Sequence, residues 1–192
     1  MELRTKFLNR IILDNGYKSY LEIGIDNCEN YNAILTETKV SVDPSDLRGC
    51  KPMFMLTSDD FFSINKSKFD LIFIDGMHTF EVSFRDLLNS LNILNENGTI
   101  VLHDTFPRKY EHQTVPATDP CWTGDVWKTI LKAQLEIKNI SIRTYDVESG
   151  ITIIKKSSNE NLNNELKPIY YYEYFTQNYK NILNIQTFPY EF

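Results

Sequence analysis

Two unbroken apolar runs that end in acidic residues constrain the fold of this chain more than any other feature. Residues 69 to 78 read FDLIFIDGMH, and residues 99 to 105 read TIVLHDT. Each run is apolar at successive positions, as in a parallel strand buried on both faces of a sheet, and stops at an aspartate, Asp75 or Asp104. Ligands of open α/β sheets bind beyond the carboxyl ends of such strands, so we expect both aspartates at a ligand site.

Predicted strands and helices alternate along the chain. Short apolar runs predict further strands at residues 19–25, 38–43 and 52–57. Amphipathic spacing predicts helices over 80–94 and 124–137. This alternation is typical of an α/β sandwich.

A late hairpin is predicted to end the sheet. Residues 139–145 alternate between apolar and polar side chains, Glu148–Gly150 form a turn, and 151–154 are apolar again. The preceding helix has Thr123 as its predicted N-cap.

Length and charge limit the classes of protein. With 192 residues the chain suits one domain, which we place at 1–156. A polar linker at 157–166 then leads into an aromatic tail to residue 192, which we expect to pack on the same domain or on a partner subunit of a homo-oligomer. The net charge of −6 argues against a duplex nucleic-acid partner.

The cysteines and the N-terminus favour a soluble cytoplasmic protein. Cys28, Cys50 and Cys121 have no metal-binding spacing, so we expect three free thiols in a reducing compartment. The N-terminus has no apolar stretch long enough for a signal peptide or a membrane span.

The turn after the first strand indicates the class of ligand. Gly24 allows close backbone approach, and Asp43 follows nineteen positions later, where a carboxylate can bind ribose hydroxyls. The turn has one glycine rather than three and carries Glu22 and Asp26, which would repel the phosphates of NAD. The cationic, phosphate-free S-adenosylmethionine fits better, although an ordinary strand with a tight turn is the alternative.

Six segments in this order resemble the class I S-adenosylmethionine-dependent methyltransferases, in particular the methyltransferase domain 24 group. They read YLEIGIDN, SVDPS, TSDDFF, FDLIFIDGMHTFE, GTIVLHDTFP and GDVWK. The resemblance covers nearly the whole chain, with Cys28 standing where many relatives have glycine. It implies a Rossmann-like, mostly parallel seven-stranded sheet with helices on both faces and an antiparallel last strand.

The resemblance also implies which residues bind the cofactor. These residues lie at or just after the ends of the first four predicted strands: Glu22, Gly24 and Asp26 at the methionine end, Asp43 at the ribose, Ser58 and Asp59 at the adenine, and Asp75. Asp60 is more simply explained as part of a helix start.

Similarity to catechol O-methyltransferases implies the catalytic groups. Asp75 and Asp104 match two metal carboxylates, which would hold Mg²⁺ or another divalent metal. His78 matches the position of the general base, and Thr105 replaces the relatives' amide ligand, for which His103 could substitute. In the simpler alternative, histidine and aspartate form a hydrogen-bonded pair that closes a turn, and Asp75 caps a helix.

Three functions remain open. The first is O-methylation of a small hydroxylated or sugar acceptor, with a divalent metal as an option. The second is metal-independent methylation of another acceptor by His78, and the third is a non-catalytic nucleoside-binding domain. The long loop at 105–122 is expected to cover the acceptor pocket with Tyr110, His112 and Trp122 as lining, and His112 is a weaker catalytic candidate.

Overall fold

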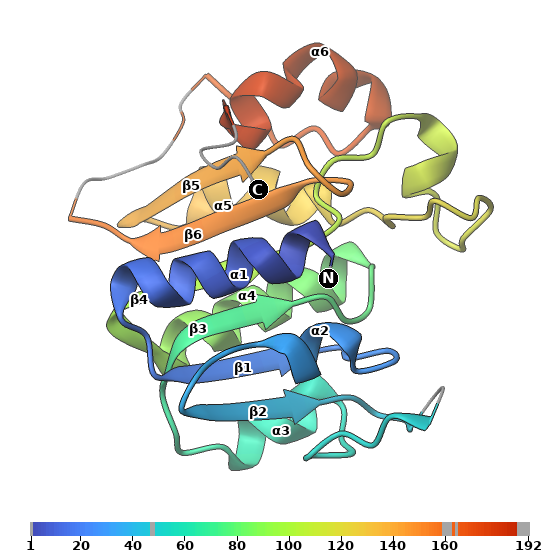
Figure 1. The fold of residues 1–192 in the computed structure, drawn as a ribbon. Helices are drawn as coiled ribbons and strands as arrows, with labels where there is room; N and C mark the ends of the chain where they lie inside the picture. Colours follow the sequence, from blue (N-terminus) through green and yellow to red (C-terminus); the bar gives the residue numbers. More distant parts are fainter. Residues whose placement is uncertain (1, 47–48, 159–162, 164, 188–192) are drawn as a thin grey trace. The chain divides into compact units, whose positions relative to one another are not determined.

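The computed structural model describes residues 2–46, 49–158, 163 and 165–187. Helices and strands alternate along most of the chain (Figure 1). In chain order the elements are α1 (Leu3–Asn15), β1 (Ser19–Ile23), α2 (Glu29–Ala33), β2 (Thr38–Val42), α3 (Ser58–Ile64), β3 (Phe69–Ile74), α4 (Phe80–Ile93), β4 (Leu94–Leu102), the 3₁₀ helix η2 (Tyr110–Gln113), α5 (Trp127–Glu136), β5 (Ile140–Tyr145), β6 (Ile151–Lys156), α6 (Tyr172–Leu183) and β7 (Ile185–Gln186).

The seven strands belong to one sheet, in the order β2-β1-β3-β4-β6-β5-β7. β1 pairs in parallel with β2 and with β3, whereas β5 and β6 are antiparallel. This mixed sheet confirms the predicted Rossmann-like α/β class, and the predicted late hairpin is present as β5 and β6.

The predicted strand at 52–57 is wrong. Among the described residues of this segment, the strand pairing consists of one isolated parallel bridge between Val42 and Phe54. Pro52 has no N–H to donate, and the side chains of Met53 and Met55 are exposed, so the segment lacks the pairing and the buried face of a strand. The seventh strand is instead the two-residue β7 in the tail, which pairs in parallel with β5.

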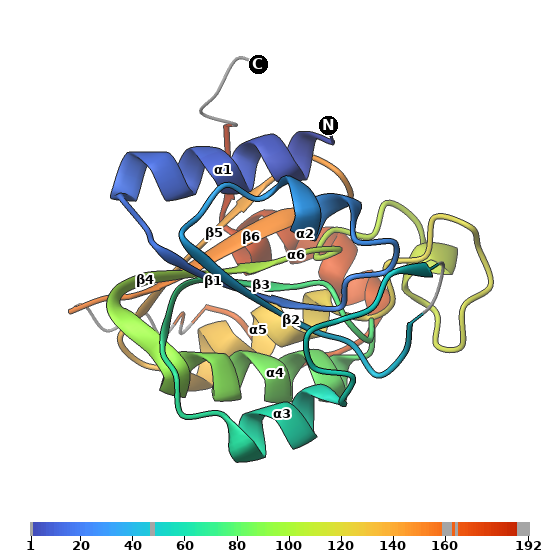
Figure 2. The same ribbon diagram turned by 60° about the horizontal axis from the view of Figure 1, so that its bottom comes forward.

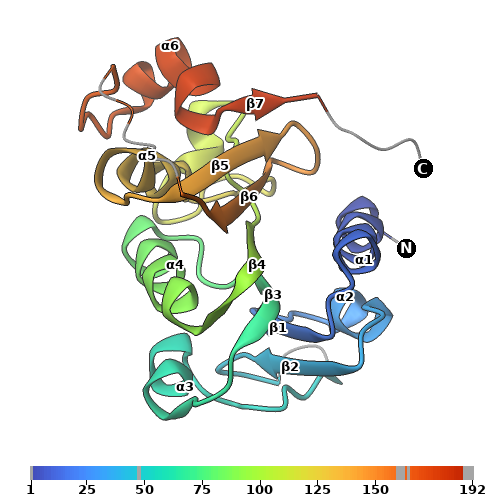
Figure 3. The ribbon, with the colours of Figure 1, turned by 90° about the vertical axis from the view of Figure 1, so that its left-hand side faces the viewer.

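The chain divides into two compact units, and among the described residues the first includes 2–77 and 86–101. Within it, α1 and α2 lie over one face of β1 and β2, and α3 lies over the other (Figures 2 and 3). Helix α1 was not predicted from the sequence. Its buried side chains recur at helical spacing: Phe7, Leu8, Ile11 and Ile12.

The second unit includes 78–85 and 102–187. α5 and α6 lie on the same side of β5 and β6 (Figure 3). The aromatic ring of Phe175 in α6 is 1% exposed, and its centroid lies 4.7 Å from that of Trp127 in α5. The tail helix therefore packs within this unit, while the division into 1–156 and 157–192 stays a prediction, and part of the predicted linker lies outside the described residues.

Thr123 is not the N-cap of α5, as the sequence analysis predicted. The helix begins at Trp127 with Val126 in the cap position. The hydroxyl of Thr123 donates instead to the carbonyl oxygens of His112 and Gly124. The Thr123 side chain thus bonds to His112, which is distant in sequence, and does not cap the nearby helix.

The prediction of three free thiols is wrong, because Cys28 and Cys50 form a disulfide with a Cα–Cα distance of 5.6 Å. The two cysteines are 22 positions apart and match no spacing rule, so the pairing depends on how the segment after β2 returns to the turn after β1. They pack with Ile25 in a small buried cluster. Cys121 is an exposed free thiol.

Within the described residues, the structure contains no helix with the length and apolar character needed to span a membrane.

Candidate active site

The turn after β1 packs closely against the turn after β3. Gly24 has φ 82°, a conformation that glycine adopts readily. A Cβ at this position would overlap the backbone carbonyl oxygen of Asp75 and lie 2.5 Å from Cα of Gly76. The close approach predicted at Gly24 is therefore, in part, an approach of the protein's own backbone, because the turns after β1 and β3 are in contact.

Asp43 links the end of β2 to this turn. One carboxylate oxygen accepts a hydrogen bond from the backbone N–H of Ile25 at 3.1 Å. The other accepts from the backbone N–H and the hydroxyl of Ser45, each at 3.0 Å. The half-buried carboxylate thus lies beside the turn, as its predicted role at a ribose requires, and its position is held by three donors.

Glu22 lies inside the unit, because its side chain is only 2% exposed. Its carboxylate accepts hydrogen bonds from the Tyr20 hydroxyl at 2.6 Å and from the Asn30 side-chain amide at 3.1 Å. Burial raises the pKa of Glu22 to about 7, although both hydrogen bonds favour the charged form. Its place at the methionine end of a cofactor stays a prediction, and the structure gives it a buried hydrogen-bonding role.

Stability is expected to depend on pH through Glu22. Its pKa is about 7 in the folded protein against an ordinary value of 4.5, so the folded state binds the proton more tightly. The contribution of Glu22 to the free energy of unfolding should therefore be fully present below pH 4.5 and be lost, by about 3 kcal/mol, as pH rises through 7. Denaturant titrations at several pH values would measure this loss.

Glu22→Gln should remove most of this pH dependence, since the amide oxygen can still accept from Tyr20 and Asn30. The matched control is Glu29→Gln, which changes an exposed carboxylate nearby and should keep the dependence. An unchanged pH profile in Glu22→Gln would contradict the assignment.

Ser58 and Asp59 occupy the first turn of α3, and Asp59 is exposed. Thr57 is the N-cap of this helix, since its hydroxyl oxygen accepts from the backbone N–H of Asp60. The Thr57 hydroxyl also donates to the Asp60 carboxylate at 2.7 Å. The prediction that Asp60 serves the helix start is confirmed, and the adenine role of Ser58 and Asp59 stays a prediction.

Asp75 follows β3 directly and forms an ion pair within the first unit. Its carboxylate lies 3.2 Å from the guanidinium of Arg4, which also pairs with Glu2 at 2.7 Å. Arg4 was not among the predicted site residues, because α1 was not predicted from the sequence. The helical spacing of the apolar residues in that segment was the signal that could have found it.

In the second unit, two histidines flank the carboxylate of Asp104. Nε2 of His78 lies 3.4 Å, and Nδ1 of His103 lies 3.3 Å, from the same carboxylate oxygen. Nε2 of His103 is 3.9 Å from the Glu148 carboxylate. The structure thus brings together three of the predicted residues, His78, His103 and Asp104.

Asp104 is held in an unusual backbone conformation. Its φ of 56° lies in the left-handed region, which costs a residue other than glycine about 1–2 kcal/mol. The backbone that follows is tied to the β5–β6 turn, since Phe106 N–H donates to the carbonyl oxygen of Ser149 at 2.7 Å. Such strain at a group of ionisable side chains is a common feature of functional sites.

The loop at 105–122 contains η2 and reaches back to His78. The rings of His78 and Trp122 have centroids 5.3 Å apart and are tilted by 35°. The indole N–H of Trp122 donates to the carbonyl oxygen of Thr114 at 2.5 Å, which fixes the ring. Of the three predicted lining residues, Trp122 therefore contacts the predicted base, while Tyr110 is exposed.

Two residues after this loop contact His78 or the segment that follows it, a role that was not predicted from the sequence. At Gly124, with φ 60°, a Cβ would overlap the carbonyl oxygen of His78 and lie 2.7 Å from its Cβ. The carboxylate of Asp125 accepts from the backbone N–H of Phe80 at the start of α4, at 2.6 Å. Asp125 thus satisfies one backbone donor of the first turn of α4 from a distant part of the chain.

Comparison with solved structures supports the fold. The SAH-bound methyltransferase of Podospora anserina is 18% identical, with a TM-score of 0.64 over 82% of this chain and 80% of that one. A putative caffeoyl-CoA O-methyltransferase from Staphylococcus aureus is 12% identical, with a TM-score of 0.63 over 82% and 84%. The Bacillus cereus O-methyltransferase in complex with SAH is 17% identical, with a TM-score of 0.55 over 81% and 82%.

Comparison with protein families gives the class. No curated protein matches the chain in a sequence search. A family model described as a methyltransferase domain matches residues 5–105, more than half of the 192 residues. The matched segment runs from α1 past β4 and includes Gly24, Asp43, Asp75, His78 and Asp104. This chain therefore belongs to that methyltransferase family, as the resemblance of its motifs predicted.

Proposed function

We propose that the protein transfers a methyl group from S-adenosylmethionine to a hydroxyl oxygen of a small acceptor, with His78 as the general base. The observation that best supports this methyl donor is the hydrogen bond between Asp43 and the backbone of Ile25. It holds a carboxylate beside the turn after β1, where it can accept from ribose hydroxyls. The SAH complexes of similar folds in Podospora anserina and Bacillus cereus support the same donor.

Charge favours this donor over a dinucleotide. Asp26 and Asp43 place carboxylates around the turn, which complement a sulfonium and an α-ammonium group and oppose a pyrophosphate. Calorimetric titration should show binding of S-adenosylmethionine and none of NAD. Formation of S-adenosylhomocysteine with a panel of hydroxylated acceptors would then test turnover.

Asp43→Ala is expected to weaken the binding of S-adenosylmethionine by about 1.5–3 kcal/mol, because a charge-assisted hydrogen bond to the ribose is lost. Since Asp43 also holds Ile25 and Ser45, Asp43→Asn is the matched variant that keeps a side-chain acceptor and removes the charge. Asp43→Asn should weaken binding less than Asp43→Ala. Wild-type affinity in Asp43→Ala would contradict the ribose role.

The proposed chemistry is an in-line displacement. The acceptor oxygen forms a bond to the methyl carbon, the carbon–sulfur bond breaks, and its electron pair stays on sulfur, giving a neutral thioether. The imidazole of His78 takes the acceptor proton, and its Nε2 lies 3.4 Å from the carboxylate of Asp104. The carboxylate of Asp104 then stabilises the imidazolium.

A divalent metal is the second candidate for activating the acceptor. Asp75 and Asp104 supply the oxygen ligands that Mg²⁺ prefers, and His103 could add a nitrogen. A metal there would lower the pKa of the acceptor hydroxyl. These carboxylate and imidazole groups are suitable ligands for a divalent metal. Because Asp75 is paired with Arg4 and Asp104 with two histidines, a metal would compete with these partners.

Chelation separates the two mechanisms. If His78 acts alone, turnover should survive exhaustive treatment with EDTA and show no increase on adding Mg²⁺. Loss of turnover with EDTA, restored by Mg²⁺, would favour the metal. A non-catalytic nucleoside-binding domain predicts donor binding with no S-adenosylhomocysteine formed under either condition.

The methyl acceptor, the cellular location and the oligomeric state are further parts of the proposal. Sugars and glycan precursors are the first acceptors to screen, on the family resemblance. Cytoplasmic location and homo-oligomerisation stay predictions, and the disulfide between Cys28 and Cys50 removes the argument for the cytoplasm that rested on free thiols.

A further inference from the structure

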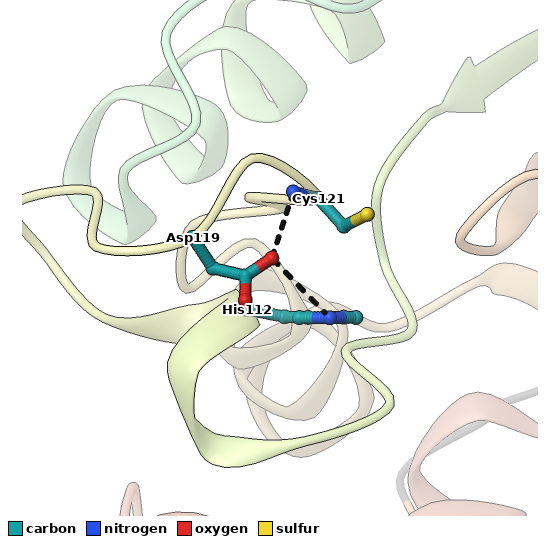
Figure 4. A group of neighbouring side chains, drawn as sticks. All are labelled: His112, Asp119 and Cys121. Carbon is teal, nitrogen blue, oxygen red and sulfur yellow. Dashed lines mark hydrogen bonds and ion pairs between the residues drawn. The ribbon is translucent and has the colours of Figure 1, made fainter.

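A second group of ionisable side chains lies in the loop between β4 and α5, apart from the proposed base. It consists of His112, Asp119 and Cys121, whose potential ligand atoms all lie within 4.8 Å of one another. Nε2 of His112 is 3.7 Å from a carboxylate oxygen of Asp119. Figure 4 shows that this oxygen lies between the imidazole and the backbone nitrogen of Cys121.

Hydrogen bonds within the loop hold the three side chains in place. The carbonyl oxygen of His112 accepts from the backbone N–H groups of Thr123 and Gly124, at 2.8 and 3.1 Å. The backbone N–H of Cys121 donates to Asp119 at 2.8 Å. The two arms of the loop are thereby joined beside the three donors, so the entropy cost of bringing ligands together is reduced before any ion binds.

The chemistry of the donors selects the class of ion. Magnesium and calcium prefer oxygen ligands, whereas a thiolate with an imidazole and a carboxylate suits Zn²⁺ or a similar transition metal. Three protein ligands leave the fourth position of a tetrahedral site to water. The three donors lie within ten residues of one exposed loop.

An ordinary ion pair is the competing explanation for part of this group. Lys109 pairs with Asp119 at 2.7 Å. This contact uses the carboxylate oxygen that faces away from His112, because Lys109 lies at Oδ2 and His112 at Oδ1. Lys109 can therefore keep its partner while Oδ1 turns to a metal. An ion pair alone does not explain why the free thiol lies beside both groups.

We propose that His112, Asp119 and Cys121 bind a divalent transition-metal ion in this loop, with Zn²⁺ as the best match. The site is separate from the Asp75 and Asp104 ligands considered above. Trp122 directly follows Cys121 and contacts the ring of His78. Metal binding would therefore rigidify the segment that packs on the proposed base.

Cobalt provides a test that does not depend on activity. The full-length protein, freed of metal with EDTA, would be titrated with Co²⁺ and followed by absorption. Because Cys28 and Cys50 are paired and Cys121 is the remaining cysteine of the three, a thiolate-to-cobalt charge-transfer band would identify Cys121 as a ligand. We expect one equivalent to saturate this band and one equivalent of Zn²⁺ to displace it.

Variants make the test specific. Cys121→Ser should abolish the band, and His112→Ala and Asp119→Asn should weaken Co²⁺ binding by roughly 100-fold or more, since each removes a ligand. Glu111→Gln, the matched control, removes a neighbouring exposed carboxylate and should leave binding unchanged. Asp104→Asn should also keep the band, which separates this site from the other candidate.

Either of two results would overturn the proposal. One is the absence of a charge-transfer band in wild-type protein kept free of oxygen, where Cys121 stays a thiol and the disulfide between Cys28 and Cys50 stays intact. The other is a Co²⁺ affinity that is equal in the wild type and in Cys121→Ser. Since none of these measurements uses methyl transfer, failure here leaves the proposed function untouched.

Discussion

Gly24→Ala is expected to destabilise the protein by about 3 kcal/mol or more and to abolish binding of S-adenosylmethionine. The added Cβ would carry a φ of 82° and overlap the carbonyl oxygen of Asp75, so it combines backbone strain with a clash against another backbone. Backbone atoms cannot move aside as a flexible side chain can. Chemical denaturation would measure the first effect, and calorimetric titration of the donor the second.

Gly16→Ala is the matched control. Gly16 also has a positive φ, 65°, but a Cβ there would meet no atom within 4 Å. Its variant should lose only about 1–2 kcal/mol and bind the donor normally. If the two variants were equally stable and bound the donor equally, the contact between the turns after β1 and β3 would not be needed for the site.

His78→Ala is expected to lower kcat by roughly 10²- to 10⁴-fold, the usual contribution of a positioned general base. The affinity for S-adenosylmethionine should change little, because no donor contact is proposed for His78. Single-turnover formation of S-adenosylhomocysteine would measure the effect. Across pH, the wild-type rate should rise as the imidazole loses its proton, and this limb should be absent in the variant.

His103→Ala distinguishes a base from a metal ligand. If His78 acts alone, loss of His103 removes only one neighbour of Asp104, and the decrease in kcat should be much smaller than in His78→Ala. If His103 holds a metal, the two variants should lose comparable activity and His103→Ala should respond to added metal. Full activity in His78→Ala would rule out its role as the base.

Much of the sheet could be predicted because its signals are local. The unbroken apolar runs before Asp75 and Asp104 identified β3 and β4, and the alternation after residue 139 identified the β5–β6 hairpin. The prediction for the segment at 52–57 failed because two of its apolar side chains, Met53 and Met55, are exposed. Composition predicts a strand only where a neighbouring strand and a buried face are available.

The candidate site could be predicted only in part. Residue types at strand ends identified His78 and Asp104, which the second unit places 3.4 Å apart. The partners of the predicted residues came from distant segments, such as Arg4 beside Asp75 and Trp122 beside His78. Such contacts leave no periodic signal in the chain.

The sequence by itself determined the α/β class of this protein through the order of its apolar runs, and the resemblance of its motifs indicated the methyltransferase family. Local periodicity and turn residues act over a few positions, so they can be read directly from the chain. Only the tertiary structure decided that Glu22 is buried, that Cys28 pairs with Cys50, and that a loop donates His112, Asp119 and Cys121 to one place. These outcomes depend on burial and on long-range packing, which arise only when distant segments meet.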